Sequence, residues 1–135
     1  MDAASIAIAA VAFLHPYLQE VGKGAAKKVG ESVTQKGEHL LSTIRTRFRA
    51  KPDGYALQTL ERMEADPANE GRQGALTAVL KEEAEKDHAF QTELAQLVLS
   101  LAKDESVTRF VTNVSGDARV GKLINIGSAH DVRIE

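Results

Sequence analysis

The chain has 135 residues, no cysteine, only 4% aromatic residues and a formal net charge of -2. The lack of cysteine excludes a disulfide framework, a thiolate metal site and a cysteine nucleophile, and the length suits one domain or one domain with a tail. Residues 1–51 carry eight Lys or Arg against four acids, whereas residues 52–104 carry five against eleven. Two interpretations are compatible with this distribution. The two parts attract each other within one fold, and the basic part binds anionic lipid once it separates from the acidic part.

The first predicted element is an apolar helix from Ala3 to Leu14 (AASIAIAAVAFL), which contains no charged residue. Twelve helical residues cover only about 18 Å of a hydrocarbon layer about 30 Å thick. The segment is either the buried first helix of a soluble bundle or a helix that is sheltered at rest and enters a membrane on activation. Its candidate membrane-targeting residues are Ile6, Ile8, Val11, Phe13 and Leu14.

Pro16 is predicted to kink the helix or to start a new one, after which a long helix covers residues 17–49. Gly22, Ala26 and Gly30 stand four apart, a ridge of small residues that would let another helix approach closely. Because glycine in a helix interior costs up to about 1 kcal/mol, this helix is either locally broken or dependent on tight packing. Its apolar stripe consists of Val29, Val33, Leu40, Leu41, Ile44 and Phe48.

Three shorter helices follow a turn at residues 50–54 (AKPDG). The first covers about residues 55–65, the second ends at about Lys86, and the third follows at once. Asp66 and Asp87 are predicted to cap the second and third of these helices. Short connections favour antiparallel neighbours, so the predicted fold is all-α: an antiparallel bundle of about four helices, the first long and preceded by the apolar N-terminal segment.

Residues 110–135 differ from the rest, because Val, Ile and Phe alternate with polar residues and glycines interrupt them. This composition and period favour β-structure. The stretch nearly repeats itself: Asn113-Val114 recurs as Asn125-Ile126, and Asp-x-Arg-[Val/Ile] recurs after 14 residues. It could stack on copies of itself, or it could form an ordinary hairpin packed on the bundle. The candidate motif residues are Asn113, Val114, Gly116, Val120, Gly121, Ile124, Asn125, Ile126, Gly127, Val132 and Ile134.

The tetrad Ile124-Asn125-Ile126-Gly127 resembles the core of the RIP homotypic interaction motif and of similar bacterial amyloid signalling sequences. In an in-register stack, each Asn can hydrogen-bond to its own copy while the flanking Ile side chains pack in a dry interface. Asn125 stands where the animal motif usually has Gln.

The whole chain resembles the bacterial cell-death effectors whose N-terminal helical domain, called Bell, is similar to the fungal HeLo four-helix death domains. The features that carry this resemblance are the Ala-rich first helix, the glycine-bearing long helix, Glu64-Ala65-Asp66-Pro67 and the terminal motif. It implies a membrane-targeting domain over residues 1–104 and an amyloid signalling tail over residues 105–135, which we expect to be disordered in the monomer.

The resemblance also implies a function: a pore-forming or membrane-disrupting effector of bacterial immunity, activated when an upstream sensor with a matching motif templates the tail. The implied partners are that sensor, further copies of the chain and anionic membrane lipids, with no nucleic acid. The implied location is the cytoplasm at rest and the inner face of the cell membrane after activation. The alternative is a non-lytic helical adaptor that recruits partners through its tail.

No catalytic constellation is evident, so we expect neither an enzyme nor a cofactor. The four histidines, His15, His39, His88 and His130, are scattered without metal-ligand spacing.

Overall fold

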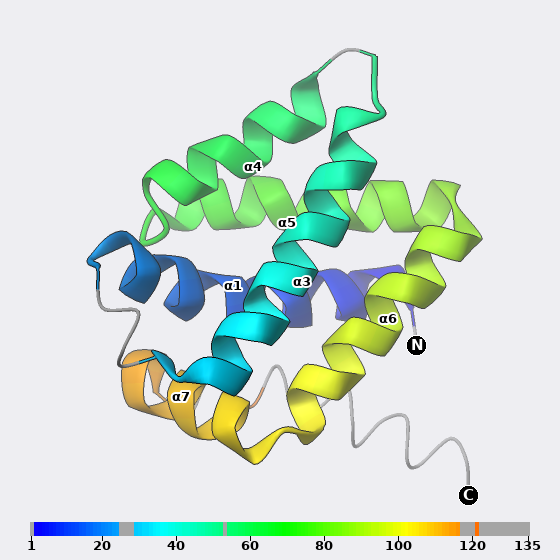
Figure 1. Ribbon diagram of the computed structural model, residues 1–135. Helices are drawn as coiled ribbons and strands as arrows, with labels where there is room; N and C mark the ends of the chain where they lie inside the picture. Colours follow the sequence, from blue (N-terminus) through cyan, green and yellow to red (C-terminus); the bar gives the residue numbers. More distant parts are fainter. Residues whose placement is uncertain (1, 25–28, 53, 117–120, 122–135) are drawn as a thin grey trace, which may run out of the picture.

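The computed structural model describes residues 2–24, 29–52, 54–116 and 121, and the regular structure within them is helical (Figure 1). The prediction of an all-α protein is therefore confirmed for this part of the chain. The described residues form six helices rather than about four: α1 (Ala3–Gly22), α3 (Glu31–Arg49), α4 (Tyr55–Ala65), α5 (Glu70–Lys86), α6 (His88–Lys103) and α7 (Glu105–Ser115). Figure 1 shows α3 and α6 running across α1 and α5 rather than alongside them.

Short polar side chains fix where most helices begin. Asp2 Oδ1 accepts a hydrogen bond from the Ser5 amide at 2.7 Å and so starts α1. Asp87 Oδ1 accepts from the amides of Ala89 and Phe90, so the predicted cap of α6 is confirmed.

The predicted cap at Asp66 is wrong. Asp66 ends α4, and the cap of α5 is Asn69, whose side chain accepts from the Arg72 amide at 3.1 Å. Asn69 is as good an N-cap as Asp66, and α5 begins directly after it at Glu70.

The predicted break at Pro16 does not occur, because α1 continues through it to Gly22. A proline inside a helix removes a hydrogen bond and costs about 3 kcal/mol or more. Phe13 and Leu14 before Pro16 and Tyr17 and Leu18 after it are all buried, at 7% exposure or less. Burial of four large side chains outweighs the cost of the proline.

The predicted long helix is locally broken instead. Lys23 is the C-cap of α1, and Gly24 and Gly30 have positive φ angles of 75° and 89°. These angles favour glycine, and Gly30 is the residue from which α3 starts. The apolar stripe of α3 is confirmed, since Val29, Val33, Leu40, Ile44 and Phe48 are buried and Leu41 is partly buried.

The ridge of small residues is therefore not formed as predicted. Gly22 ends α1 and Gly30 precedes α3, both are exposed, and no atom lies within 4 Å of a Cβ built at either position. Ala26 lies outside the described residues.

Residues 105–115 form α7, so the prediction of β-structure from Phe110 onward is wrong for Phe110 to Ser115. The expectation of a disordered tail from residue 105 is likewise wrong for residues 105–115. Val107, Phe110 and Val111 of α7 are buried. Asp104 caps the helix by accepting from the Ser106 amide at 2.8 Å. Gly116 ends it with a φ of 85°.

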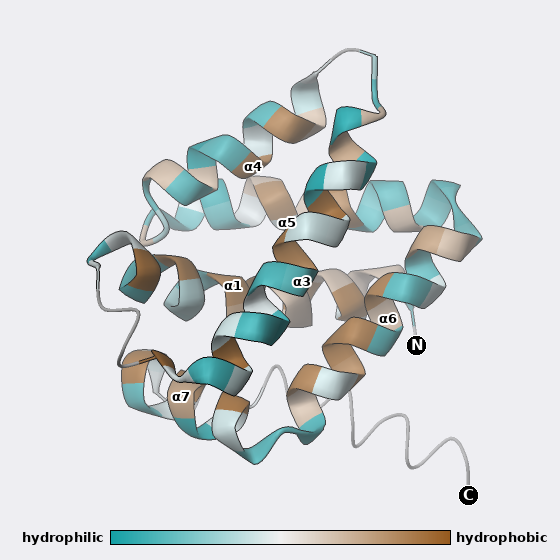
Figure 2. Cartoon of the chain, viewed as in Figure 1, coloured by the Kyte–Doolittle hydropathy of each residue, from teal (hydrophilic) through white to brown (hydrophobic). Residues whose placement is uncertain are grey.

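The core is a single cluster of apolar side chains drawn from all six described helices. Figure 2 shows polar and apolar residues alternating along α3, α4 and α5, as expected for helices with one outward face. In α1, by contrast, twelve of the twenty residues are buried. The core is organised around α1.

Candidate functional site

The candidate membrane-targeting residues all lie on α1, and four of the five are inside the protein. Ile6, Val11, Phe13 and Leu14 are at most 3% exposed, whereas Ile8 is 43% exposed. The N-terminal segment is thus sheltered in this fold, and Ile8 is the part of it that faces outward.

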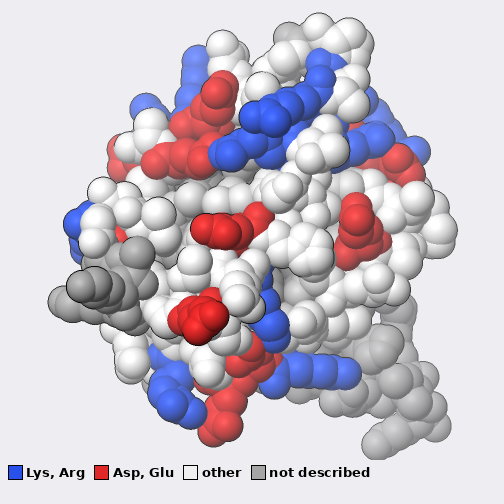
Figure 3. All heavy atoms as spheres, viewed as in Figure 1, with Lys and Arg blue, Asp and Glu red and all other residues white. Residues whose placement is uncertain are grey.

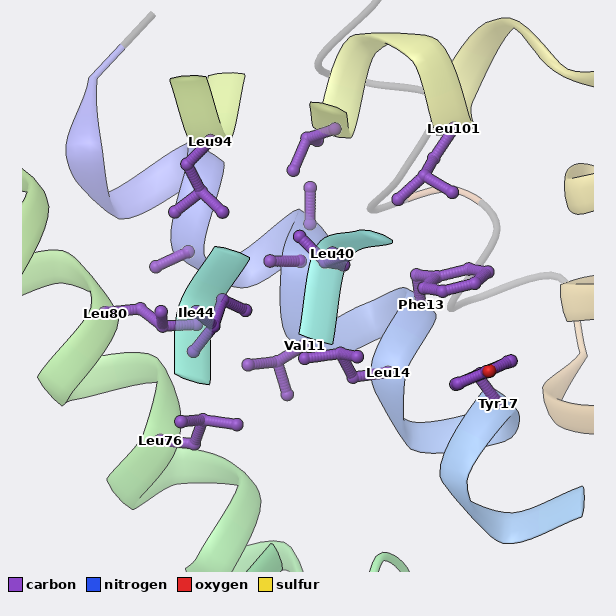
Figure 4. Close-up of a cluster of buried hydrophobic side chains, with 14 of the residues drawn as sticks. Val11, Phe13, Leu14, Tyr17, Leu40, Ile44, Leu76, Leu80, Leu94 and Leu101 are labelled. Carbon is purple, nitrogen blue, oxygen red and sulfur yellow. The ribbon is translucent and has the colours of Figure 1, made fainter. Parts of the chain in front are cut away.

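Three helices contact α1 most: α5, α6 and α7. α3 crosses it as well, because the Tyr17 ring on α1 lies against Gly37 on α3. Figure 4 shows side chains of α1 converging with those of its neighbours: Val11, Phe13, Leu14 and Tyr17 from α1, Leu40 and Ile44 from α3, Leu76 and Leu80 from α5, and Leu94 and Leu101 from α6. Apolar side chains of α3, α5 and α6, with Val107, Phe110 and Val111 of α7, therefore enclose α1.

General magnitudes of side-chain transfer favour the enclosed position of α1. Moving four buried side chains of this size into water would cost about 6–12 kcal/mol. Insertion of the five candidate residues into a membrane would gain only about 1.5–3 kcal/mol per helix. α1 therefore stays in the core unless another process supplies free energy.

The closest approach of α1 to α3 is at Tyr17. A Cβ built on Gly37 would lie 2.5 Å from the Tyr17 Cε1 and Cζ atoms, so only glycine fits there. The Tyr17 ring also stacks on Phe13, with centroids 5.4 Å apart. Burial, and to a lesser extent the charge of Glu38, raise the pKa of the Tyr17 hydroxyl.

Ion pairs join the basic N-terminal part of the chain to the acidic middle part. Arg47 on α3 pairs with Glu83 at 3.0 Å and with Asp87 at 2.8 Å, and Lys51 reaches the same Glu83 carboxylate at 3.4 Å. The Glu83 side chain is only 4% exposed, so the two cations satisfy a buried charge. The Arg47 guanidinium also lies over the Phe90 ring, 5.6 Å from its centroid.

A second such pair joins Arg45 to Glu64 at 2.6 Å. Figure 3 shows Lys and Arg side chains over the upper part of this face beside acidic ones. Attraction between the two parts of the chain is thus present in the fold.

Asp104 connects α3 to the start of α7. Its carboxylate lies 2.7 Å from Lys36 Nζ and accepts a hydrogen bond from Ser32 Oγ at 2.9 Å, while its other oxygen caps α7. Hydrogen bonding to Lys36, supported by Ser32 and the Ser106 amide, lowers the pKa of Asp104 to about 2 despite partial burial.

α7 in turn covers α1. Its buried residues belong to the same core as α1, and Ser115 Oγ lies 3.4 Å from His15 Nδ1. The predicted amyloid motif begins within α7, at Asn113, and continues beyond it, so the helix that covers α1 and that motif overlap in the chain.

The candidate motif residues are only partly described. Asn113 is exposed and Val114 is half-buried, both on α7, and Gly116 ends that helix. Gly121 has no atom within 4 Å of an added Cβ. The remaining motif residues lie outside the described residues: Val120, Ile124, Asn125, Ile126, Gly127, Val132 and Ile134.

The described part of the chain contains no group of three or more His, Asp or Glu side chains that could hold a metal ion. His15 is half-buried, His39 and His88 are exposed, and His130 lies outside the described residues.

Two positions that organise this region were not predicted as functional or packing sites: Glu83 and Asp104. Gly37 is one of the glycines that make the predicted long helix either locally broken or dependent on tight packing, but its partner Tyr17 was not predicted. Glu83 has no local sequence pattern that distinguishes it from other helix residues. Asp104 does have one, because it precedes an apolar residue that begins a helical spacing.

Among the described helices, α1 is the one whose length and composition would allow it to cross a membrane, and 61% of its apolar window is buried within the protein. Buried core helices and signal sequences share this property. Compared with protein-family models, curated proteins and solved structures, the chain gives no match.

Proposed function

We propose that this protein is a cell-death effector that disrupts membranes after its C-terminal motif is templated into an amyloid by an upstream sensor. We also propose that its helical part is a domain of the Bell and HeLo-like kind and that its C-terminal part is an amyloid signalling motif. The protein waits in the cytoplasm and acts at the inner face of the cell membrane.

The observation that carries the proposal is the position of α1. The helix with the composition closest to a membrane span is also the most enclosed helix, with Ile6, Phe13 and Leu14 at 1% exposure or less. A lytic segment must be hidden until it is needed, and this arrangement hides it.

The neighbourhood of α7 supports a route from the tail to α1. α7 packs on α1, α3 and α6. The first motif residues, Asn113 and Val114, lie on α7 itself, and the motif residues from Val120 onward follow it in the chain. Stacking of the tail into in-register strands would gather many copies of the chain at one place. Pulling α7 from its site would uncover the part of α1 around His15 and Tyr17, and this assembly is the source of free energy that α1 needs to leave the core.

Assembly of many copies would also compensate for the small free-energy gain of inserting a single α1 helix. Several α1 helices side by side would add their gains of about 1.5–3 kcal/mol each. Release of Arg45, Arg47 and Lys51 from their carboxylate partners would free positive charge for anionic headgroups.

The second candidate function is a non-lytic adaptor that recruits partners through its tail. The same burial favours it, because a helix surrounded by α3, α5, α6 and α7 is sufficiently explained as the core of a stable domain.

Dye release from vesicles discriminates the two functions. Full-length protein seeded with preformed tail fibrils should release dye from anionic vesicles, and less at high salt because salt screens the attraction of the basic part. If seeded protein assembles but leaves anionic vesicles sealed at low salt, the adaptor is correct.

A further inference from the structure

A polar cleft of about 310 Å³ lies between α4 and α5, on helices that do not include α1. One wall is a face of α4, with residues spaced by three and four, and the other is the first turns of α5. The lining residues are Tyr55, Gln58, Thr59, Arg62, Asn69, Gly71, Arg72 and Ala75.

The charge of this cleft has one sign. Arg62 and Arg72 line it from opposite walls, and no Asp or Glu is among its lining residues. Arg72 Nη1 donates to the backbone oxygen of Arg62 at 2.8 Å, which leaves the rest of its guanidinium donors available. The side chain of Arg62 is exposed and has no carboxylate partner among the residues that the structure describes.

Three other arginines of the described residues are paired with carboxylates. Arg45 and Arg47 pair with carboxylates of other helices, and Arg109 pairs with Glu105 one turn away. Within the described part of the chain, the cleft therefore brings together two guanidinium groups whose charge no carboxylate neutralises.

The chemistry that such a cleft recognises is a tetrahedral oxyanion. A guanidinium presents donors in a fork that matches phosphate oxygens, and two of them from opposite walls can hold one phosphate group. The lining also includes Gly71 in the first turn of α5, where backbone amides and the helix dipole favour negative charge. Tyr55, 60% exposed, and Gln58 supply further polar groups at the same opening.

We infer that the α4–α5 cleft binds a phosphate group, held by Arg62 and Arg72. The group can come from a soluble phosphorylated compound or from the headgroup of an anionic lipid, which share this chemistry. The site exists in the resting fold, so it does not depend on membrane disruption or on assembly of the tail.

The test is a titration of isotope-labelled full-length protein with inorganic phosphate and with glycerol phosphate, at constant ionic strength, followed by NMR. Amide signals of Arg62, Gly71 and Arg72 should shift and saturate. Arg62→Gln should weaken binding by about tenfold or more, because it removes charge-assisted hydrogen bonds. Arg72→Gln should do the same but also removes the hydrogen bond that closes α4, so Arg62→Gln is the decisive variant.

Arg49→Gln is the matched control. Arg49 is exposed, lies outside the cleft lining and makes no ion pair with another described residue, so its loss changes the net charge equally. It should alter phosphate affinity by less than about twofold if the site is specific. Thermal unfolding of each variant checks that the fold is retained.

Vesicle binding identifies the source of the phosphate. If Arg62→Gln lowers binding of unseeded protein to phosphatidylglycerol vesicles as well as to glycerol phosphate, the lipid headgroup is a ligand. If vesicle binding is unchanged while glycerol phosphate binding falls, the ligand is a soluble phosphorylated compound. The inference is overturned if neither soluble probe gives a saturable shift, or if Arg49→Gln weakens binding as much as Arg62→Gln.

Discussion

The ring of Tyr17 occupies the space that a side chain at Gly37 would need, so α1 and α3 cross at a glycine. A Cβ at Gly37 would lie 2.5 Å from two ring carbons, and the ring cannot move freely because it stacks on Phe13. Gly37→Ala should therefore lower the free energy of unfolding by about 1–2 kcal/mol, since overpacking outweighs the helix propensity gained. Urea denaturation at pH 7 measures this loss.

Gly74→Ala is the matched control for that substitution. Gly74 lies within α5, is exposed, and has no atom within 4 Å of an added Cβ. Alanine there should raise the free energy of unfolding by about 0.5–1 kcal/mol. Equal effects of the two substitutions would show that the Tyr17–Gly37 contact is not tight.

The Asp104–Lys36 pair predicts how stability depends on acid. The folded-state pKa of Asp104 is about 2, below its ordinary value of 3.8, so this carboxylate stabilises the fold above about pH 4. That contribution is lost as the pH falls from about 5 through 2. Because the side chain is 14% exposed, we expect a contribution of about 1–2 kcal/mol after screening.

Asp104→Asn should lower stability at pH 7 by about that amount and flatten the loss of stability between pH 5 and 2. Asn is an equally good N-cap, so the α7 cap is kept and the effect isolates the ionic contact. Asp66→Asn, a change at an exposed helix end, should leave the acid profile nearly unchanged. An unaltered profile for Asp104→Asn would contradict the assignment.

The helices with strong local patterns could be predicted from the sequence. α4 was predicted with its observed bounds, and the end of α5 and the cap of α6 at Asp87 were predicted too. Their apolar spacing and polar caps are local properties that the packing preserves.

α7 could have been predicted but was not. Val107, Phe110, Val111 and Val114 are spaced by three, four and seven residues, the spacing of one helix face, and Asp104 precedes them. The high β-propensity of Val and Phe favours a strand instead, but propensity is the weaker guide where tertiary packing decides.

The course of α1 and the glycine contact could not be predicted. Continuation through Pro16 depends on side chains that are buried by distant helices, and the role of Gly37 depends on where the Tyr17 ring lies. Likewise, the sequence shows that the segment is apolar but not that Ile8 alone among its candidate residues faces outward.

Because Ile8 is exposed, its proposed role in lysis can be separated from its role in folding. Ile8→Asp should lower stability by no more than about 1 kcal/mol, since the side chain is 43% exposed. Near the centre of an inserted helix, however, Asp costs about 2.5–3.5 kcal/mol and cancels the apolar gain. The variant should fold and assemble normally but release little dye from vesicles.

Val21→Asp is the control for Ile8→Asp, because Val21 is 41% exposed but stands at the end of α1. A charge at a helix end can reach the membrane surface, so dye release should be largely retained. Loss of release in both variants, or in neither, would contradict insertion of α1.

A peptide of residues 116–135 should form fibrils that bind thioflavin, because it carries the tetrad and most of the repeat without the residues of α7. Ile126→Asp should prevent assembly, since a charge repeated about every 4.8 Å along a stack repels itself. Gly127→Pro should also prevent it by removing a backbone donor. A peptide that stays monomeric at high concentration for days would refute the amyloid motif.

The measurement that tests the central claim most directly is dye release by a protein whose α7 can be locked onto α1. The Ser115 and His15 side chains lie 3.4 Å apart, and the natural chain has no cysteine, so His15→Cys with Ser115→Cys offers one defined crosslink, closed by oxidation or by a short bifunctional maleimide. Seeded protein should release dye from anionic vesicles when reduced and should fail to do so when crosslinked, although its tail still forms fibrils. Equal dye release from both forms would show that α1 need not separate from α7, and the account of a sheltered helix would be wrong.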